Sequence, residues 1–405
     1  MPDQLPIDEL EPKANPRALP SGWRWARLGE VCELNPRRPP DLARAADAPT
    51  TFVPMQAVDE THGAITRPEL RPFKEVQKGY TYFGEGDVLF AKITPCMQNG
   101  KHAIARDLAG GFGFGSTEFH VLRPGPAIAP EWVHFFIRQP SVLEKAKSYF
   151  TGAVGQQRVP ESYLVGIDVP LPPLDEQKRI TAFLNERMAV VERARAAAEA
   201  QLEATKALPA AYLRAAFSSP EAQQWPVKPF GELVENFDGR RVPVKLDERR
   251  GRKGVYPYYG ASGVIDYIDE FLYEGDFLLI GEDGANLILR SSPIAFRASG
   301  RFWVNNHAHV VQPKSIVSLD YLLHFFALTD LRPYVTGAAQ PKLTQEDMNS
   351  IPVPLPPERD QQRITSMLNE QVRLAEGVGQ AMGEALQAVN KLPAALSRRA
   401  FDGEL

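Results

Sequence analysis

Residues 169–186 read VPLPPLDEQKRITAFLNE and residues 353–370 read VPLPPERDQQRITSMLNE, a repeat that decides the organisation of the whole chain. Twelve of the eighteen positions are identical, and Val353 of the second copy corresponds to Val169 of the first. The same shift in numbering aligns KALPAAYLRAAF at 206–217 with NKLPAALSRRAF at 390–401. The segment between these motifs therefore has the same length in both copies although its residues differ. Self-similarity at a fixed spacing indicates an internal duplication.

Each copy of the repeat predicts a long helix that begins after its prolines. The LPP run cannot be helical, because proline lacks the amide donor and restricts the residue before it. The acids that follow the prolines are favoured in a first turn. Apolar side chains then recur at steps of three and four residues with one longer gap, which gives each helix a narrow seam suited to a partner helix. The seam residues are Ile180, Leu184, Met188, Val191, Ala198 and Leu202 in the first copy, and Ile364, Leu368, Val372, Ala375, Met382 and Leu386 in the second.

The lengths and ends of these helices can also be predicted. The run from 175 to 206 corresponds to about 45 to 48 Å of helix at 1.5 Å per residue. Pro209 and Pro393 are then expected to begin a second, shorter helix, since proline is tolerated in a first turn. If the two seams pair in antiparallel fashion, the chain forms a coiled coil with an internal pseudo-two-fold axis. The alternative is two unrelated surface helices on separate domains.

The segments 19–168 and 219–352 have a different residue pattern, with glycine and proline turns around short strand-like runs such as TYFGEGDVLFAKI at 81–93. Each also contains one helical stretch, which makes the predicted fold class α+β. The expected organisation is a disordered tail at 1–18, a globular domain at 19–168, a helical region at 169–218, a globular domain at 219–352 and a helical region at 353–405.

The composition of the 405-residue chain excludes several classes of protein. Its formal charge is −4, so any nucleic-acid binding must depend on local clusters of positive charge. The two cysteines, Cys32 and Cys96, cannot form a disulfide framework or a thiolate zinc site. The acidic start MPDQLPIDEL does not resemble a signal peptide, and no apolar run approaches the ~18 residues of a membrane span. We therefore expect a cytoplasmic protein that does not bind membranes.

Catalytic patterns are weak throughout the sequence. The stretch GGFGFG at 110–115 is followed by strand-like residues, which favours a tight turn over a nucleotide-binding loop. Asp168, Glu176 and Lys178 match a nuclease pattern formally, but the second copy lacks the first acid and the lysine, and a helix start explains the acids. The chain contains neither an Asn-Pro-Pro-aromatic run nor a GxxxxGK[ST] phosphate loop. We expect no catalytic residues in this chain.

Metal binding is equally poorly supported by the sequence. His307 and His309 lie on one face of a predicted strand, but no third ligand is evident nearby. His309 aligns with His120 in the first copy, which favours a packing role. We therefore expect no metal site.

Candidate binding residues gather in four loops. The stretch 240–253 contains seven basic and two acidic side chains and is followed by YPYYGASG, a composition that suits phosphate binding. The stretches 89–101, 151–159 and 336–343 offer amide, hydroxyl and basic groups that can contact base edges. A solvated loop remains the alternative for 240–253. The candidates are Lys92, Thr94, Gln98, Asn99, Lys101, Gln156, Gln157, Arg158, Arg240, Arg241, Arg249, Arg250, Arg252, Lys253, Tyr256, Tyr258, Tyr259, Gln340 and Lys342.

Over essentially its whole length the chain resembles the specificity subunit of Type I restriction-modification systems. The resemblance is carried by the two LPP-x₃-Q-x-R-I helix starts, by ITPCMQNGK and GFGSTEFHVLRP, and by YPYYGASG and GEDG. It implies that the globular domains are target-recognition domains, each reading one half of a split double-stranded DNA target, while the paired helices fix the spacing. The second helix start departs from the first, with Asp360 and Gln362 in place of Glu176 and Lys178.

The resemblance also implies partners that perform the chemistry. Two methyltransferase subunits would dock on the helical regions, and two ATP-driven restriction subunits would lie outside them. S-adenosylmethionine, ATP and Mg²⁺ would then belong to those partners and not to this chain. The alternative from another class is a coiled-coil adaptor with two protein-binding heads.

Overall fold

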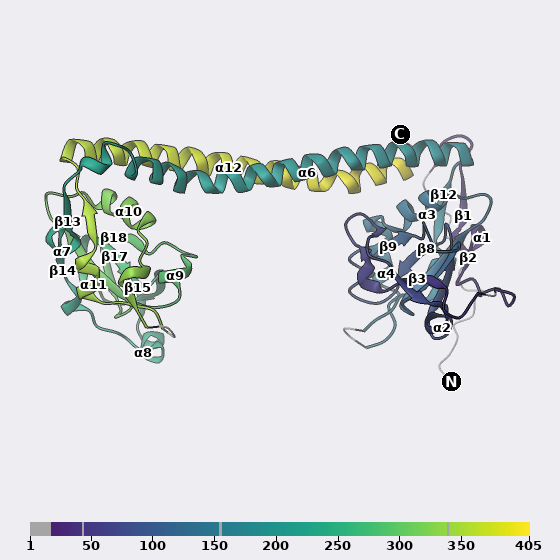
Figure 1. Ribbon diagram of the computed structural model, residues 1–405, viewed down its shortest axis with the longest axis horizontal. Helices are drawn as coiled ribbons and strands as arrows, with labels where there is room; N and C mark the ends of the chain where they lie inside the picture. The colour runs from purple at the N-terminus through teal and green to yellow at the C-terminus, as the bar shows by residue number, and fades with distance from the viewer. Residues whose placement is uncertain (1–17, 43, 154–155, 338–339) are drawn as a thin grey trace. The chain divides into compact units, whose positions relative to one another are not determined.

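A computed structural model describes residues 18–42, 44–153, 156–337 and 340–405 of the chain (Figure 1). It divides into two compact units, unit 1 with residues 1–197 and 386–405, and unit 2 with residues 198–385. Each unit combines one globular domain with a segment of each long helix, whereas the sequence-based boundaries gave each helix a region of its own. The predicted tail at 1–18 lies, except for Ala18, outside the described residues.

The globular part of unit 1 contains two four-stranded sheets, with strand orders β6-β3-β10-β7 and β2-β11-β8-β9. A two-stranded pair, β1 with β12, joins the start of the domain to the residues just before the long helix. The strands are β1 (Arg24–Arg27), β2 (Cys32–Leu34), β3 (Pro49–Val53), β4 (Val58–Asp59), β5 (Ala64–Ile65), β6 (Glu69–Pro72), β7 (Thr81–Gly84), β8 (Val88–Ala91), β9 (His102–Ile104), β10 (Phe112–Gly115), β11 (Phe119–Pro124) and β12 (Asp168–Leu171). The short helices are α1 (Leu28–Val31), α2 (Phe73–Val76), α3 (Pro130–Ile137), α4 (Pro140–Lys147) and α5 (Glu161–Gly166).

The globular part of unit 2 contains one six-stranded sheet, with strand order β14-β19-β17-β18-β15-β16. A second antiparallel pair, β13 with β22, repeats the arrangement of β1 and β12. The strands are β13 (Val227–Pro229), β14 (Val234–Asn236), β15 (Lys253–Gly260), β16 (Gly263–Ile268), β17 (Tyr273–Gly281), β18 (Ala295–Val304), β19 (Ala308–Pro313), β20 (Val335–Thr336), β21 (Lys342–Leu343) and β22 (Pro352–Pro354). The short helices are α7 (Phe230–Leu233), α8 (Leu246–Gly251), α9 (Asn286–Leu289), α10 (Leu319–Leu328) and α11 (Gln345–Ser350).

The two long helices, α6 (Leu174–Phe217) and α12 (Glu358–Phe401), have 44 residues each, or about 66 Å at 1.5 Å per residue. The expected breaks at Pro209 and Pro393 are wrong, because both prolines lie inside continuous helices. An interior proline costs about 3 kcal/mol. The turns beyond each proline bury apolar side chains, Leu213 in α6 and Phe401 in α12, and burial of such side chains offsets that cost.

The helices pair in antiparallel fashion, as the duplication predicts. In unit 1 the N-terminal part of α6 packs against the C-terminal part of α12, and in unit 2 the opposite ends of both helices pack together. The predicted seam residues lie on the covered faces. Buried among them are Ile180, Leu184, Val191, Ile364, Leu368 and Ala375, and half-buried are Met188, Ala198, Leu202, Val372, Met382 and Leu386.

The last aromatic residue of each long helix anchors that helix to a short helix in the same unit. Phe401 of α12 lies with its ring centroid 4.3 Å from that of Trp132 in α3. Phe217 of α6 lies 5.4 Å from the ring of Tyr321 in α10. Phe217 and Phe401 are the matching final residues of the repeated motif, so the duplication is visible in the cores as well as in the chain order.

The glutamine of the repeated motif fastens the first turn of each long helix. The Gln177 side chain donates to the carbonyls of Ala127 and Pro172, both at 2.9 Å, and accepts a bond from the amide of Ala129 at 2.8 Å. Gln361 makes the same three bonds in unit 2, each 2.9 Å long, to the carbonyls of Ile316 and Pro356 and from the amide of Ser318. Both side chains are buried, so the motif requires an amide at this position.

Candidate functional site

In unit 1, the two loops that carry candidate residues are joined to each other and to the segment before β11. The amide of Thr94 donates to the carbonyl of Gln157 at 2.9 Å, and the amide of Val159 donates to the carbonyl of Lys92 at 2.9 Å. Arg158 makes two bonds, of 2.9 and 2.7 Å, to the carboxylate of Glu118, which precedes β11. Residues far apart in the sequence therefore form one loop cluster.

Unit 2 repeats this frame with different side chains. The amide of Gly284 donates to the carbonyl of Pro341 at 2.9 Å, and the amide of Leu343 donates to the carbonyl of Glu282 at 2.8 Å. The Lys342 ammonium lies 3.2 Å from the Glu282 carboxylate. In every one of these loops the two bonded residues are separated by one residue, and the first accepts a hydrogen bond while the second donates one. The two loop clusters are therefore internal copies of each other.

A buried histidine supports each loop cluster. The Nε2 of His120 donates to the carbonyl of Val159 at 2.9 Å, and the Nε2 of His309 donates to the carbonyl of Leu343 at the same distance. The Nδ1 of His309 lies 2.5 Å from a carboxylate oxygen of Asp238. Burial alone would raise the pKa of Asp238, but hydrogen bonds and the charges around it hold that pKa below its usual value. These contacts fit the packing role predicted for His309.

The basic stretch of unit 2 differs from the sequence-based expectation. Arg249 donates to the carboxylate of Asp266 at 3.2 Å and covers the ring of Tyr258 at 4.8 Å. Tyr258 is fully buried and accepts a bond from the amide of Val244. Arg249 and Tyr258 therefore hold β15 against its neighbours through contacts within unit 2, and DNA contact by these two residues stays a prediction.

Arginines on both sides of Arg249 are also engaged within unit 2. Arg252 donates to Asp269 and Glu270 at 3.1 and 2.7 Å. Arg241 pairs with Glu282 and donates to the carbonyl of Ala308 at 2.8 Å. The count of charged side chains within 240–253 missed these partners, because the acids lie on later segments of the chain. The apparent positive cluster is thus largely neutralised in the fold.

The remaining candidates are placed as follows. Gln98, Asn99, Gln156 and Gln340 are exposed on the loop clusters, while Lys101 is half-buried. In the stretch 240–253, Arg250 is 70% exposed and pairs with Asp247, Lys253 is exposed and pairs with Asp266, and Arg240 is exposed and donates to the carbonyl of Leu272. Tyr256 and Tyr259 are half-buried, and the ring of Tyr259 lies against those of Phe296 and Phe302.

Two arginines that the sequence did not single out fix the turns of the loop clusters. Arg138, at the end of α3, donates to the carbonyls of Gly100, Glu60 and Thr61 at 2.6, 3.1 and 2.9 Å. Arg290 donates to the carbonyls of Phe326, Ala327 and Thr329 at the end of α10. Each bond joins segments 36 to 78 residues apart, so no local pattern could have revealed them.

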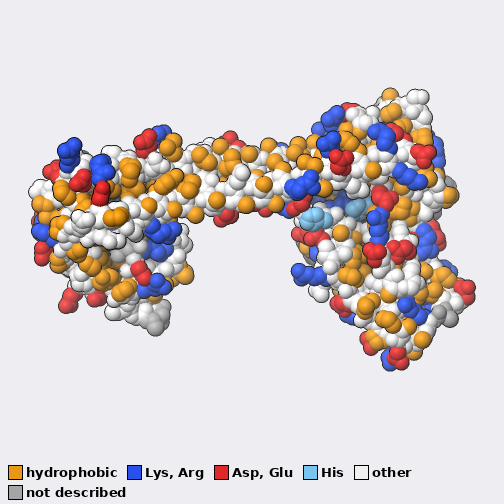
Figure 2. Space-filling model, turned by 45° about the horizontal axis from the view of Figure 1, so that its top comes forward, with side chains coloured by type: hydrophobic (Ala, Val, Ile, Leu, Met, Phe, Trp, Pro, Cys, Tyr) orange, Lys and Arg blue, Asp and Glu red, His pale blue; other side chains and the backbone are white. Residues whose placement is uncertain are grey.

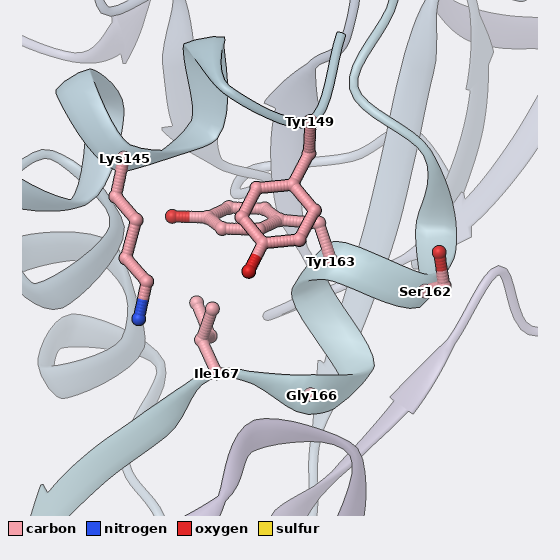
Figure 3. A pocket seen from close by; sticks show the side chains of 6 residues that line it. All are labelled: Lys145, Tyr149, Ser162, Tyr163, Gly166 and Ile167. Atoms are coloured by element: carbon pink, nitrogen blue, oxygen red, sulfur yellow. The ribbon is translucent and has the colours of Figure 1, made fainter. Parts of the chain in front are cut away.

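Two cavities of unit 1 differ widely in size. The pocket beside Tyr149 and Tyr163 (Figure 3) has a volume of about 80 Å³, far smaller than the ~300 Å³ of a small ligand site. A hollow of about 900 Å³ in unit 1 lies between α3 and the two long helices. Within the described ranges no group of three or more His, Cys, Asp or Glu side chains could hold a metal ion.

Charges of both signs are interspersed on the molecular surface shown in Figure 2. The face in that view carries no broad area of a single sign, in agreement with a formal charge of −4. Of the helices in the described part of the chain, none is both long and apolar enough to cross a bilayer.

The hollow of unit 1 contains a histidine whose pKa predicts an acid-sensitive domain. Burial, together with the positive charge of Arg138, lowers the pKa of His134 to about 4 from an ordinary 6.5. The unfolded chain takes up this proton near pH 6.5 but the folded chain only near pH 4, so the stabilising contribution is complete above pH 6.5 and is lost as the pH falls. We expect His134 to reduce the free energy of unfolding of unit 1 by about 1 to 2 kcal/mol at pH 5 relative to pH 7.

Urea titrations at pH 7 and pH 5 test this expectation. His134→Gln should flatten the dependence of the unfolding free energy on pH. An unchanged slope in His134→Gln would assign the acid sensitivity to other groups.

Comparison with known proteins adds independent observations. The chain matches the family model described as type I restriction modification DNA specificity domain over residues 20–198 and 222–376. The type I restriction enzyme EcoAI specificity subunit of Escherichia coli is 32% identical over 236 residues, which cover 58% of this chain and 39% of that protein. The matched segment thus spans about two fifths of that relative.

Two solved structures share the fold. A chain of an assembly described as a type I R-M system has a TM-score of 0.78 at 22% identity, with 96% of this chain and 100% of that chain covered. The HsdS subunit from Thermoanaerobacter tengcongensis has a TM-score of 0.70 at 23% identity, with 96% and 99% covered. The arrangement of two mixed domains and two long helices is therefore an established fold.

Proposed function

Because the chain belongs to the type I restriction modification DNA specificity domain family, with matches in both copies of its duplication, we propose that it selects the DNA target of a restriction-modification complex. Each globular domain reads one half of a split sequence in double-stranded DNA. The paired helices α6 and α12 set the distance between the two halves. The chain itself carries out no chemical step.

The observation that carries this proposal is that the two loop clusters share their backbone hydrogen bonds but differ in their side chains. Both units hold the same loops together through the same backbone bonds, at Thr94 and Val159 in one and at Gly284 and Leu343 in the other. The side chains on these loops nevertheless differ between the copies. A common scaffold with divergent exposed side chains is what two readers of different base sequences require, because bases are read by side chains and not by the frame.

Partners supply the chemistry in this proposal. Two methyltransferase subunits, using S-adenosylmethionine, dock on the helical segments, and the hollow beside α6 and α12 in unit 1 supports docking there. Two restriction subunits use ATP and Mg²⁺. No residue of this chain is assigned to any of these cofactors. The complex works where the DNA is, in the cytoplasm.

The test is selection of duplexes from a randomised library by the full chain together with its methyltransferase partner. We expect the enriched duplexes to share two short blocks of bases separated by a constant number of unselected positions. A variant with Gln98→Ala and Asn99→Ala should bind its target about ten-fold or more weakly and lose preference in one block only, since an amide that pairs with a base contributes ~1 to 3 kcal/mol.

Other outcomes would contradict the proposal. Enrichment without any sequence preference, or no retention of DNA, would favour the adaptor with two protein-binding heads. Loss of preference in both blocks would show that the amides of unit 1 support the fold and do not read one half of the target.

A further inference from the structure

The turn that follows β8 in unit 1 has a structural counterpart after β17 in unit 2. The amide of Asn99 donates to the carbonyl of Pro95 at 3.0 Å, and the amide of Leu289 donates to the carbonyl of Ala285 at 2.9 Å. Both pairs are related by the same shift in numbering that relates Thr94 to Gly284. The two turns therefore correspond in chain position and in this bond, although the amides of Met97 and Leu287 bond to carbonyls that do not correspond, those of Ile93 and Gly284.

An apolar side chain anchors each turn in its core, and the next two residues face outward. Met97 and Leu287 are the buried anchors. Unit 1 then presents the exposed amides Gln98 and Asn99. At the equivalent positions unit 2 presents Ile288 and Leu289, which are 40% and 73% exposed. Because Leu287 already fills the core position, packing within unit 2 does not account for the two outward aliphatic side chains.

The turn that carries these aliphatic side chains is fixed without any ligand. Arg290 has a φ of +51° and anchors the turn to the end of α10 through its guanidinium group. The side chain of Asn286 bonds to the amide and carbonyl of Ser292 at 3.0 and 3.1 Å. This turn contains helix α9, which is labelled in Figure 1 where it projects from unit 2. The exposed pair is thus held in position before any partner arrives, which lowers the cost of binding.

The surroundings of the turn favour DNA as the partner. The bond from Gly284 to Pro341 places the turn in the same loop cluster as Gln340 and Lys342, both exposed. Amide and ammonium groups are the usual contacts to base edges and phosphates. Among the four bases, thymine alone offers a methyl group in the major groove, and aliphatic side chains recognise it by apolar contact.

We propose that Leu289, flanked by Ile288, reads the half-site of unit 2 through apolar contact with the C5 methyl group of a thymine. This inference rests on the proposed function and specifies the recognition chemistry of its second domain. Unit 1 reads with amides at the same position of the same turn, so the two half-sites are recognised by different forces.

The experiment uses the full chain with its methyltransferase partner and the target duplex obtained by selection. The Gln98→Ala, Asn99→Ala variant identifies the block read by unit 1, and the thymines of the other block are replaced singly by deoxyuridine, which lacks only the methyl group. We expect one replacement to weaken binding about four-fold, the usual effect of removing one buried methyl group. Leu289→Ala should weaken binding to the thymine duplex and abolish that particular difference.

Leu70→Ala is the matched control, because Leu70 is a 67% exposed leucine of unit 1 outside the loop cluster. It should leave the deoxyuridine effect intact. The inference is overturned if every deoxyuridine duplex binds the unaltered chain like the thymine duplex, or if the losses from Leu289→Ala and deoxyuridine simply multiply. Weaker association of Leu289→Ala with the methyltransferase, without a deoxyuridine effect, would assign the turn to a protein contact. These outcomes leave the selected target itself unchanged, whereas failure of selection would count against the proposed function.

Discussion

A Gln361→Leu chain is expected to lose about 3 kcal/mol or more of the free energy of unfolding of unit 2. Leucine has a similar volume but leaves the carbonyls of Ile316 and Pro356 and the amide of Ser318 without their partner. Each buried polar group that loses its hydrogen bond costs about 1 to 3 kcal/mol. Against a total of about 5 to 15 kcal/mol for a domain, such a loss lowers the melting temperature by roughly 10 °C.

The chain offers a matched control in the next residue. Gln362 is exposed, and its side chain makes only a 3.5 Å contact with Glu358. Gln362→Leu should change the free energy of unfolding by no more than about 0.5 kcal/mol. Thermal and urea unfolding followed by circular dichroism compare the two variants. Equal stabilities would show that the amide of Gln361 is not needed to hold α12.

The duplication extends this expectation to the other unit. Gln177 makes the corresponding three bonds in unit 1, so Gln177→Leu should destabilise unit 1 by a similar amount. If only one of the two substitutions destabilises its unit, the shared motif has different structural roles in the two copies.

The helices and their pairing could be predicted because their signal is local. Seam residues such as Ile180 and Leu368 recur at helical spacing, and both are buried where the helices pack. The error at Pro209 has a physical origin outside its own turn. The free-energy cost of Pro209 depends on its own helical turn. The packing of Phe217 against α10, which keeps the helix continuous, is a tertiary contact that the local sequence does not reveal.

The loop clusters were harder to predict, because the side chains and carbonyls that their residues contact come from distant segments of the chain. The sequence places only Asp247 and Glu248 close to Arg249, whereas its carboxylate partner, Asp266, lies on β16. The fold likewise joins Thr94 to Gln157, which belongs to a loop near the end of the same domain. Sequence reasoning missed Leu289 because an exposed leucine indicates a contact surface only after its turn is aligned with the turn of unit 1 that carries Gln98 and Asn99.

The paired helices lead to the second large expectation, which concerns the spacing of the target. Helix α6 runs from unit 1 into unit 2, and α12 returns with the same number of residues. Each unit contains segments of both helices, so a change of length must be made in both to preserve their pairing. We consider four residues added after Ala200 and four after Gly383, an increment close to one helical turn that keeps each seam facing its partner.

Four helical residues add about 6 Å, and one base pair rises about 3.4 Å, so the gap between the half-sites should lengthen by one or two base pairs. The blocks themselves should not change, because the recognition loops are untouched. Affinity for the original target should fall at least a hundred-fold, since only one half-site could then be engaged and specific binding exceeds non-specific binding by about 10³ or more. Selection with the lengthened chain measures both effects. An unchanged gap would mean that the helices do not set the spacing, and altered blocks would mean that the insertions disturb the recognition domains.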